Sequence, residues 1–276
     1  MTEPGPHRPI ASDVTSRRSD VGRSRARNED AVIAVTWPAP GGRGACSVLA
    51  VADGMGGADG GEVASRLAIE AVEEIVAARW AAGLLTGEDE WVAAYRQAFT
   101  YAAERMRKTA DADGSLQGMG TTLTALSLQN GTVVFAHIGD SRAYLYRGGS
   151  LRRLTTDHNA AHELAAQGRI AVEEVATHRS RNVLTRWLGA DVAAVEPEFG
   201  GLAAQPGDLF LVCSDGLHTM VSDPDLAGAL HAGAAGSQDA LDAVAQRLIE
   251  AANAAGGKDN ISVALGLHVG ASAAGA

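Results

Sequence analysis

The sequence is poor in aromatic residues, in cysteine and in basic charge. Aromatic residues make up 4% of a chain whose hydrophobic content is 46%, so alanine and glycine must fill much of the interior and we expect closely packed layers. The two cysteines, Cys46 and Cys213, lie in apolar runs, which favours free buried thiols over a disulfide. The formal charge of −10 (23 basic minus 33 acidic residues) argues against nucleic acid as a partner, because its binding requires a basic surface.

Long apolar runs are also missing. No segment reaches the roughly 18–20 apolar residues of a membrane span, and the N-terminus lacks the apolar core of a signal peptide, so we expect a cytoplasmic protein that does not bind membranes. Residues 1–14 and 270–276 have the polar or small-residue composition of flexible tails. No linker divides the residues between them, so 15–269 is predicted to be a single domain.

Two stretches with helical spacing of apolar residues follow one another. The first, over 64–75, lies behind Asp59 and Glu62, which have the spacing of a capping box. The second begins near Thr86 and Asp89, which we expect to cap it. Its apolar stripe consists of Trp91, Ala94, Tyr95, Ala98, Ala102 and Met106. Both stripes are predicted to face the core.

Strands dominate the middle of the chain, from Thr121 to Arg153. The dipeptides Asn130-Gly131 and Gly148-Gly149 predict hairpin turns there. A polar, helix-prone stretch interrupts the strands over 157–181, and a late helix precedes a final strand over 260–268. Strands outside βαβ alternation, with helices arriving in pairs, predict an α+β fold of antiparallel sheets with helices on the outer faces.

Acidic residues stand where strand-like runs meet loops. Five short segments share this feature: Arg27–Asp30, Val51–Gly57, His137–Arg142, Cys213–Gly216 and Lys258–Asn260. Acids that are distant in sequence can therefore converge at one end of a sheet. Buried carboxylates this close would repel one another unless a cation lay between them, and hard divalent cations prefer oxygen ligands. The pattern predicts a Mg²⁺- or Mn²⁺-dependent hydrolase site.

The residues around these acids fit phosphate chemistry. Glycines after Asp53 and Asp215 would let the backbone approach an ion or a phosphate closely, and the Gly54 carbonyl can supply a further ligand. Four or five acids suit a pair of metal ions bridged by a water that loses its proton and becomes the nucleophile. Arg25, which we place on the same strand edge as Asp30, has a planar fork that matches phosphoryl oxygens.

In this order, the motifs resemble the PPM family of metal-dependent protein serine/threonine phosphatases (protein phosphatase type 2C), particularly its compact bacterial members. The matching stretches are Ser19–Gly22 with Arg25 and Asn28–Asp30, Asp53–Gly57 with Gly61–Ser65, Gly118–Thr122, His137–Arg142, Cys213–Leu217 and Gly257–Asn260. They run from about residue 16 to 268, nearly the whole chain.

The resemblance implies a four-layer αββα sandwich with metals at one end. It implies that Asp53 bridges two Mn²⁺ or Mg²⁺ ions, that Gly54 gives its carbonyl to one, and that Asp215 and Asp259 complete the other. A third, weaker metal would bind Asp140 together with Asp215.

The resemblance also assigns roles around the metals. Asp30, with Glu29, would act mostly through metal-bound water, and Arg25 would hold the substrate phosphate. Residues 157–181 correspond to a flap that frames the entrance for protein substrates, and Thr177 falls where some relatives use a hydroxyl near the third metal. The implied partners are phosphoproteins and a bacterial serine/threonine kinase, and the predicted form is a monomer.

Two departures from the family pattern concern the proton donor and the flap. Many relatives carry a histidine within or just after the Asp-Gly-x-Gly-Gly turn, where this chain has Met55 and Ala58. We hypothesise that a water held through Asp140 protonates the leaving group instead. Asp140→Asn should then slow phosphoserine hydrolysis far more than aryl phosphate hydrolysis, and equal losses would remove the idea. Asn159 replaces a commoner serine in the flap, a change that we interpret as tuning substrate choice.

Other readings are weaker. A cysteine-based phosphatase needs an arginine about five residues after its nucleophile, and Cys213 has none. His158, His162 and His178 lack a partner set at zinc-ligand spacing. An inactive member of the same fold that binds phosphoproteins or kinases stays open as the alternative, although such scaffolds usually lack the metal-binding acids that this chain retains.

Overall fold

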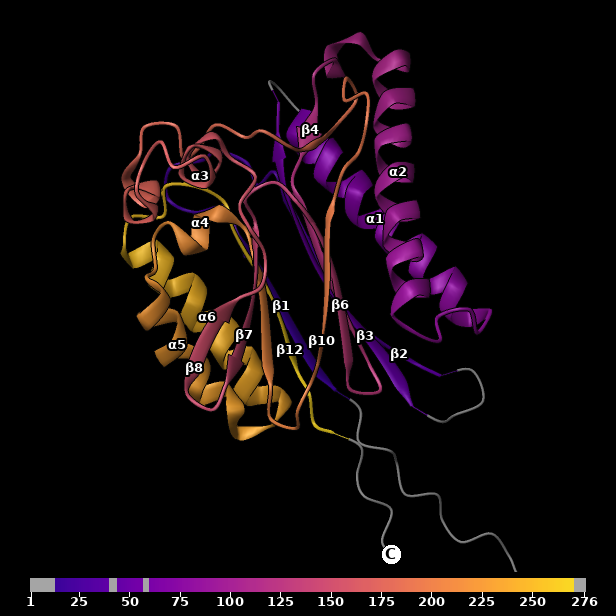
Figure 1. The fold of residues 1–276 in the computed structure, drawn as a ribbon, viewed down its shortest axis with the longest axis vertical. Coiled ribbons are helices and arrows are strands. Elements are labelled where there is room, and N and C mark those ends of the chain that lie inside the picture. Colours follow the sequence, from indigo (N-terminus) through magenta and orange to yellow (C-terminus); the bar gives the residue numbers. More distant parts are fainter. Residues whose placement is uncertain (1–12, 40–43, 57–59, 271–276) are drawn as a thin grey trace, which may run out of the picture.

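The computed structural model describes residues 13–39, 44–56 and 60–270. Two antiparallel sheets lie face to face between two layers of helices (Figure 1). One sheet has the order β1 (Val14–Asp20), β12 (Ile261–Leu267), β11 (Leu209–Cys213), β7 (Arg142–Arg147) and β8 (Ser150–Arg153). The other has the order β10 (Glu198–Ala203), β6 (Thr132–Ile138), β5 (Leu123–Gln129), β3 (Ala45–Met55), β4 (Gly120–Thr121) and β9 (Leu188–Gly189), with β2 (Asp30–Pro38) paired to β3. The predicted αββα sandwich is confirmed.

The helices fall into three groups. The long helices α1 (Gly60–Ala81) and α2 (Glu88–Ala112) cover the outer face of the β3 sheet, and α5 (Asp223–His231) and α6 (Gln238–Ala254) cover the outer face of the β12 sheet (Figure 1). The short helices α3 (Ala160–Ala166) and α4 (Asp215–His218) lie at one end of the sandwich. The 3-10 turns are η1 (Gly114–Leu116), η2 (Val172–Thr177) and η3 (Ala232–Ala235).

The strands separate three apolar cores by the alternation of their side chains. In β3, Val48, Ala50 and Ala52 pack under α1 and α2, whereas Leu49 and Val51 face the other sheet. Strand β11 alternates in the same way between the core under α5 and α6 and the core between the sheets. Residues 46–52 of β3 and all of β11 are buried, so the strands appear in the sequence as continuous apolar runs.

Alanine does much of the packing, as the low aromatic content predicts. Six alanines of the paired helices have no exposed surface: Ala64, Ala68 and Ala71 of α1 and Ala94, Ala98 and Ala102 of α2. The aromatic residues that are present concentrate on α2, where the rings of Trp91 and Tyr95 lie 5.7 Å apart and are fully buried. Both cysteines are free and buried, as expected.

The hairpin turns agree with the sequence interpretation. Asn130 and Gly131 have φ values of 50° and 76° between β5 and β6, and Gly148 and Gly149 have 57° and 88° between β7 and β8. Two successive positive φ values are typical of the type I′ turn, whose twist matches that of the strands it joins.

Two local predictions need correction, and others concern residues that the structure does not describe. Thr86 and Asp89 do not cap α2: the N-cap is Gly87, without a side-chain bond, and Asp89 sits inside an acidic first turn that complements the helix dipole. Val14, expected in the tail, opens β1 and pairs with Leu267. Asp59, the expected cap of the first helix, and Ala58 lie outside the described residues, as do the tail residues 1–12 and 271–276.

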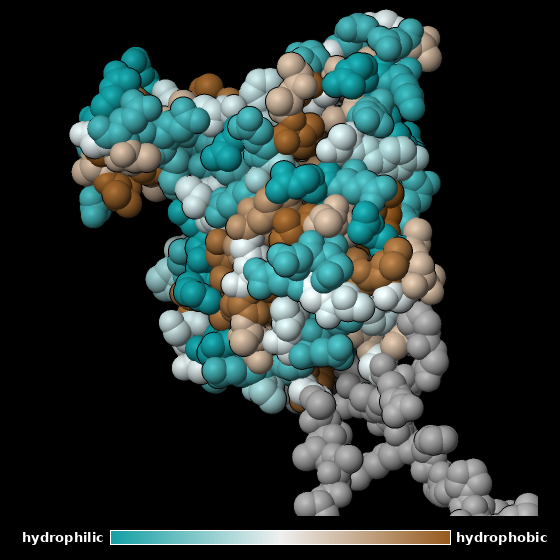
Figure 2. Space-filling model, turned by 45° about the vertical axis from the view of Figure 1, so that its right-hand side comes forward, coloured by the Kyte–Doolittle hydropathy of each residue, from teal (hydrophilic) through white to brown (hydrophobic). Residues whose placement is uncertain are grey.

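The described part of the surface exposes few large apolar side chains. Figure 2 shows hydrophilic residues over much of one side of the molecule, with apolar residues interspersed between them. The large apolar side chains exposed within the described ranges are Val21, Leu84, Val172, Val183 and Val269, which lie in separate segments of the chain, four of them outside helices and strands. None of the helices in those ranges combines the length and the apolar character needed to cross a membrane.

Candidate active site

Acids from remote parts of the chain meet at the end of the sandwich that carries α3 and α4 (Figure 1). Asp53 lies near the end of β3, directly opposite Asp30, the first residue of β2, with which it is paired in register. Asp215 opens α4 after β11, and Asp259 lies just before β12, separated from it by Asn260. Asp140 lies in the turn between β6 and β7. The expected convergence of strand-end carboxylates is therefore present.

A cavity of about 540 Å³ lies among these acids. It is lined by Arg25, Glu29, Asp53, Gly54, Met55, Gly56, Thr122, Asp140, Asn182, Leu184, Trp187, Asp215 and Asp259. Asp30 lies outside this lining, where its Oδ2 accepts a hydrogen bond of 2.7 Å from the Ser214 hydroxyl. Thr177 is exposed on η2 and bonds the carbonyl of Glu174; it is not among the lining residues, so its assignment to substrate binding stays a prediction.

The acids of the cluster resist ionisation. Burial is the main reason that the pKa of Asp140 rises to about 8, that of Asp30 to about 7 and that of Asp215 to about 6. Burial raises the pKa of Asp53 well above its ordinary value, and the neighbouring charges of Asp30 and Asp215 raise it further. A cation between these groups would reverse the effect, because it would stabilise the ionised form.

Two buried carboxylate oxygens test whether a divalent cation fits. The Oδ1 atoms of Asp30 and Asp215 accept no hydrogen bond from any residue that the structure describes. A buried polar atom without a partner is costly, and carboxylate oxygens are the ligands that Mg²⁺ and Mn²⁺ prefer. The donor set therefore fits a hard divalent cation.

The two Asp-Gly dipeptides owe their glycines to close backbone packing. A Cβ on Gly54 would lie 2.1 Å from the carbonyl oxygen of Gly61 and 2.5 Å from that of Glu29. A Cβ on Gly216 would lie 2.0 Å from the carbonyl oxygen of Asn260. The sequence interpretation, in which these glycines leave room for an ion or phosphate, missed this reason: without them the acidic loops could not approach one another.

Arg25 reaches the cluster from a loop. It lies between β1 and β2, not on a strand edge as predicted, and its Nη2 is 2.7 Å from Oδ2 of Asp259. Its side chain is 51% exposed. The guanidinium is thus held at the cavity with part of its donor set open to a ligand, as a phosphate clamp requires.

Several residues that the sequence interpretation did not assign build the frame. The Asn260 side chain accepts from the N–H of Glu29 and donates to the carbonyls of Val21 and Arg27, so it fastens the Arg25 loop to β12. The Thr122 hydroxyl accepts from the N–H of Asp53 and bonds Ser141. These bonds fix the backbone on which the acids stand.

The flap contributes more than its predicted range. Asn182, Leu184 and Trp187 lie beyond 181 and form one wall of the cavity. They belong to an irregular segment, so no periodic pattern could have identified them. Asn159 has a structural role: it is 3% exposed and its side chain caps α3 by accepting from the N–H of His162.

A cavity that gathers carboxylate ligands beside an arginine defines a cation-dependent hydrolase site. The family model for protein phosphatase 2C matches residues 22–262. The serine/threonine phosphatase stp of Listeria welshimeri is 36% identical over 252 residues, which cover 90% of this chain and 93% of the relative. The solved structure of the Mycobacterium tuberculosis serine/threonine phosphatase PstP/Ppp has a TM-score of 0.78 at 35% identity and covers 94% of this chain and 99% of that one.

A second solved structure bears on the metal. The catalytic domain of PstP, solved in complex with two manganese ions, has a TM-score of 0.75 at 34% identity and covers 94% of this chain and 98% of that one. The chain therefore belongs to the protein phosphatase 2C family and is a protein serine/threonine phosphatase.

Proposed function

We propose that the chain hydrolyses phosphoserine and phosphothreonine in proteins by direct attack of water on phosphorus, with two Mn²⁺ or Mg²⁺ ions held by Asp53, the Gly54 carbonyl, Asp215 and Asp259. The observation that carries the proposal is the convergence of buried carboxylates on one cavity beside Arg25. The two manganese ions of the related PstP domain support the same number here. Bound ions would lower the pKa of the water that they coordinate and would neutralise charge on the phosphoryl group.

The chain's own residues divide the remaining work. Arg25 orients the phosphoryl group with the part of its fork that Asp259 leaves open. Glu29 and Asp30 act through ordered water, Asp30 from behind the cavity wall with the Ser214 hydroxyl as its support.

The lining of the cavity supports water as the nucleophile. Among the described residues that line it there is no cysteine, serine or histidine. Its one hydroxyl, on Thr122, is engaged with the N–H of Asp53 and with Ser141. The proposal assigns the aspartates of the lining to the cations and not to attack on phosphorus, so we expect no covalent phospho-enzyme.

The proposal also includes a third cation site, the class of substrate and the oligomeric state. Asp140 and Asp215 would hold a weaker cation, and water there would supply the hypothesised proton, since Met55, which lines the cavity where many relatives carry a histidine, has no proton to donate. The substrates would be cytoplasmic proteins phosphorylated by a bacterial serine/threonine kinase, and the phosphatase would act as a monomer. With a net charge of −10, attraction of phosphoproteins must come from the local cationic site.

Hydrolysis of p-nitrophenyl phosphate and of a phosphothreonine peptide tests the proposal. We expect activity that requires Mn²⁺ or Mg²⁺, that a chelator abolishes, and that Asp53→Asn lowers by about 10³-fold or more, since loss of cation charge stabilisation is worth several kcal/mol. Asp208→Asn, which changes a buried aspartate paired with Arg147, is the control and should retain activity per folded molecule. Activity that survives both the chelator and Asp53→Asn would refute the proposal, and a phospho-enzyme trapped by rapid acid quench would refute direct attack.

A further inference from the structure

A second cluster of chemically active side chains lies next to the acidic cavity. His137, His158 and Glu198 place one ligand-type atom each within 4.8 Å of one another. His137 lies near the end of β6 opposite Glu198 of β10, and His158 lies at the base of the flap. Both histidines are at most 1% exposed, and their ring centroids are 4.7 Å apart. At first sight this is a site for a transition metal.

The hydrogen bonds argue against a metal there. The N–H of Gly139 donates to Nδ1 of His158 at 3.2 Å, which places the ring proton of the neutral His158 on Nε2. Nε2 of His137 lies 3.0 Å from the carbonyl oxygen of Thr156 and must donate to it, while Nδ1 bonds the Thr124 hydroxyl. All four ring nitrogens either carry a proton or already accept a hydrogen bond, so the rings have no lone pair left for a cation.

The bonds of His158 instead hold one turn of the chain. Its backbone N–H donates to the carbonyl of Gly139 at 2.7 Å, so His158 bonds both polar groups of that residue. Gly139 has φ of 108°, and a Cβ there would lie 2.5 Å from Cγ2 of Thr122. The turn is thus tightly enclosed, and the next residue is Asp140.

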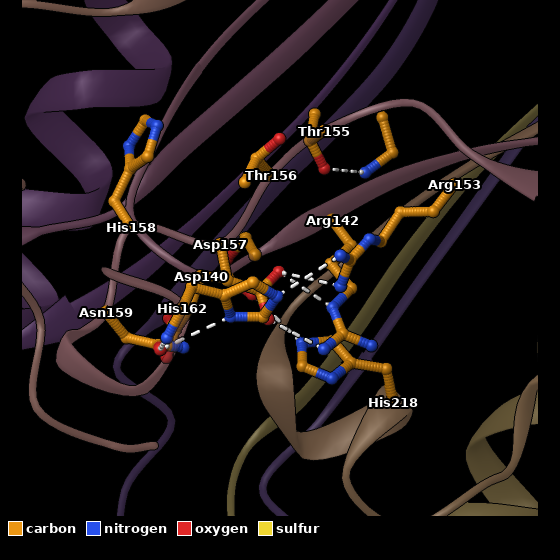
Figure 3. A network of polar contacts seen from close by, with 12 residues as sticks. Asp140, Arg142, Arg153, Thr155, Thr156, Asp157, His158, Asn159, His162 and His218 are labelled. Atoms are coloured by element: carbon orange, nitrogen blue, oxygen red, sulfur yellow. Dashed lines mark hydrogen bonds and ion pairs between the residues drawn. The ribbon is translucent and has the colours of Figure 1, made fainter. Parts of the chain in front are cut away.

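Asp140 is held on its other side as well. Nε2 of His218, from α4, lies 2.9 Å from the Asp140 carbonyl oxygen and donates to it. Figure 3 shows His218 beside Asp140 near the Arg142 and Asp157 pair, while the ring of His158 turns away from Asp157. The backbone of Asp140 is therefore fixed from two separate elements, and its carboxylate faces the cavity.

His158 also contacts the wall of the cavity through its backbone. The carbonyl of His158 accepts from the N–H of Thr185 at 2.9 Å, and Asn159 forms a bridge with Leu184, a lining residue. His158 thus joins the Asp140 turn to the segment that forms the substrate wall. Nε2 of His158 is 3.6 Å from a carboxylate oxygen of Glu198, which favours the proton on that nitrogen.

We propose that His158 is a positioning residue for Asp140. By accepting the Gly139 N–H, His158 holds the Asp140 carboxylate in the orientation that would bind a cation. Its carbonyl, bonded to the Thr185 N–H, links the Asp140 turn to the segment that forms the substrate wall. The assignment rests on the proposed function, because it presumes that Asp140 binds a cation. Residues that orient a metal ligand without touching the metal typically alter affinity by about 10–100-fold when they are changed.

Two substitutions separate positioning from metal ligation. His158→Asn places an amide oxygen where Nδ1 was and keeps an acceptor for the Gly139 N–H, but removes Nε2. His158→Leu removes both. If the Leu variant does not fold, His158→Gln replaces it, because its amide lies at the Nε2 position and leaves no acceptor at Nδ1. His268→Leu is the matched control: His268 is 8% exposed, bonds Asp13 and follows β12 at the end away from Asp259.

The measurement is calorimetric titration of the chelator-treated proteins with Mn²⁺. In the parent, the Asp140 site is the one that Asp140→Asn removes. We expect His158→Leu to weaken that site by about 10–100-fold, and His158→Asn and His268→Leu to leave it within about threefold of the parent. The Asp53-dependent sites should stay within about threefold in all three variants.

The alternatives give different results. An Asp140 site of parental affinity in His158→Leu would overturn the assignment. Equal weakening in the Asn and Leu variants would also overturn it, because the effect would then require Nε2, as a ligand does. A parent in which Asp140→Asn removes no site would overturn it while leaving the Asp53-dependent sites intact, whereas a parent with no Asp53-dependent binding would refute the proposed function itself.

Discussion

Two sets of carboxylates in this molecule, one buried and one partly buried, differ in which groups balance their charge. Asp157 and Asp208, which are 4% and 1% exposed, each face an arginine fork, Arg142 for Asp157 and Arg147 for Asp208. Of the acids around the cavity, Asp259 bonds Arg25, whereas Asp53 and Asp140 face mainly other carboxylates. The first set consists of closed ion pairs, and the second is an open set of ligands.

The pKa values express this difference. Burial tends to raise the pKa of Asp157, but the hydrogen bonds and charge of Arg142 outweigh it and lower the value to about 2. For Asp140, burial and the charge of Asp215 act in the same direction and raise the pKa to about 8. Burial therefore does not set the pKa by itself. Asp157 bonds an arginine, whereas no arginine of the described residues bonds Asp140, which identifies a place where a free cation would bind.

The closed pair also supports the open set. Arg142 directly follows the turn that carries Asp140, and its partner Asp157 directly precedes His158. Arg153 adds a second, longer contact to Asp157 at 3.4 Å, and Figure 3 shows both arginines converging on it. The ion pair therefore fixes the base of the flap beside the cation site.

The largest stability effect should come from breaking this closed pair. Asp157→Asn leaves Arg142, whose side chain is 18% exposed, without its counter-charge, and we expect the free energy of unfolding to fall by about 3–5 kcal/mol. Urea unfolding at pH 7.5 in the presence of a chelator measures it, so that cation binding does not contribute.

An exposed pair supplies the control. Arg66 and Glu70 lie at i, i+4 on α1 with side chains 55% and 38% exposed, and Arg66→Gln, which leaves the second bond of Glu70 to Arg105 in place, should cost no more than about 0.5 kcal/mol. If Asp157→Asn cost as little as Arg66→Gln, burial would not distinguish the two pairs and the comparison would fail.

Much of the fold is predictable because the local signals agree with one another. The continuous apolar runs of β6 and β11, the glycine turns and the periodic apolar stripe of α2 are each recognisable in the sequence. The predicted end of the N-terminal tail and the predicted cap of α2 are wrong. The tail prediction fails because the start of β1 depends on tertiary pairing, here of Val14 with Leu267.

The acids of the site are also predictable, because each follows or precedes an apolar run. What the sequence does not reveal is the frame. Asn182 and Trp187 lie on an irregular segment that reaches the cavity only through the folded flap. The role of Asn260 depends on contacts with Glu29 and Val21, more than 230 residues away in sequence. Such long-range contacts leave no local pattern.

The pH dependence of the cation-free protein sharpens the comparison further. Above about pH 7 the unfolded chain has released its carboxyl protons, whereas folded Asp140, with a pKa of about 8, still holds its proton. The raised pKa of Asp53 acts in the same direction. The folded state then binds more protons, so its stability falls as pH rises. Between pH 7 and 9 we expect a loss of at least about 1.4 kcal/mol, the equivalent of one pKa unit at one carboxyl.

The lower limit of this window matters because buried histidines act in the opposite direction. Burial lowers the pKa of His137 and of His218 to about 3, so below about pH 6.5 the unfolded chain binds the extra protons and stability rises with pH. Urea unfolding in the presence of a chelator from pH 7 to 9 therefore measures the contribution of the carboxyl groups to the pH dependence of the free energy of unfolding. Asp53→Asn should reduce the slope, and saturating Mn²⁺ should abolish or reverse it, because the cation binds the ionised form. If the stability of the chelator-treated protein stayed constant across this window, the cavity acids would already be ionised without a cation, as the arginine-paired Asp157 is.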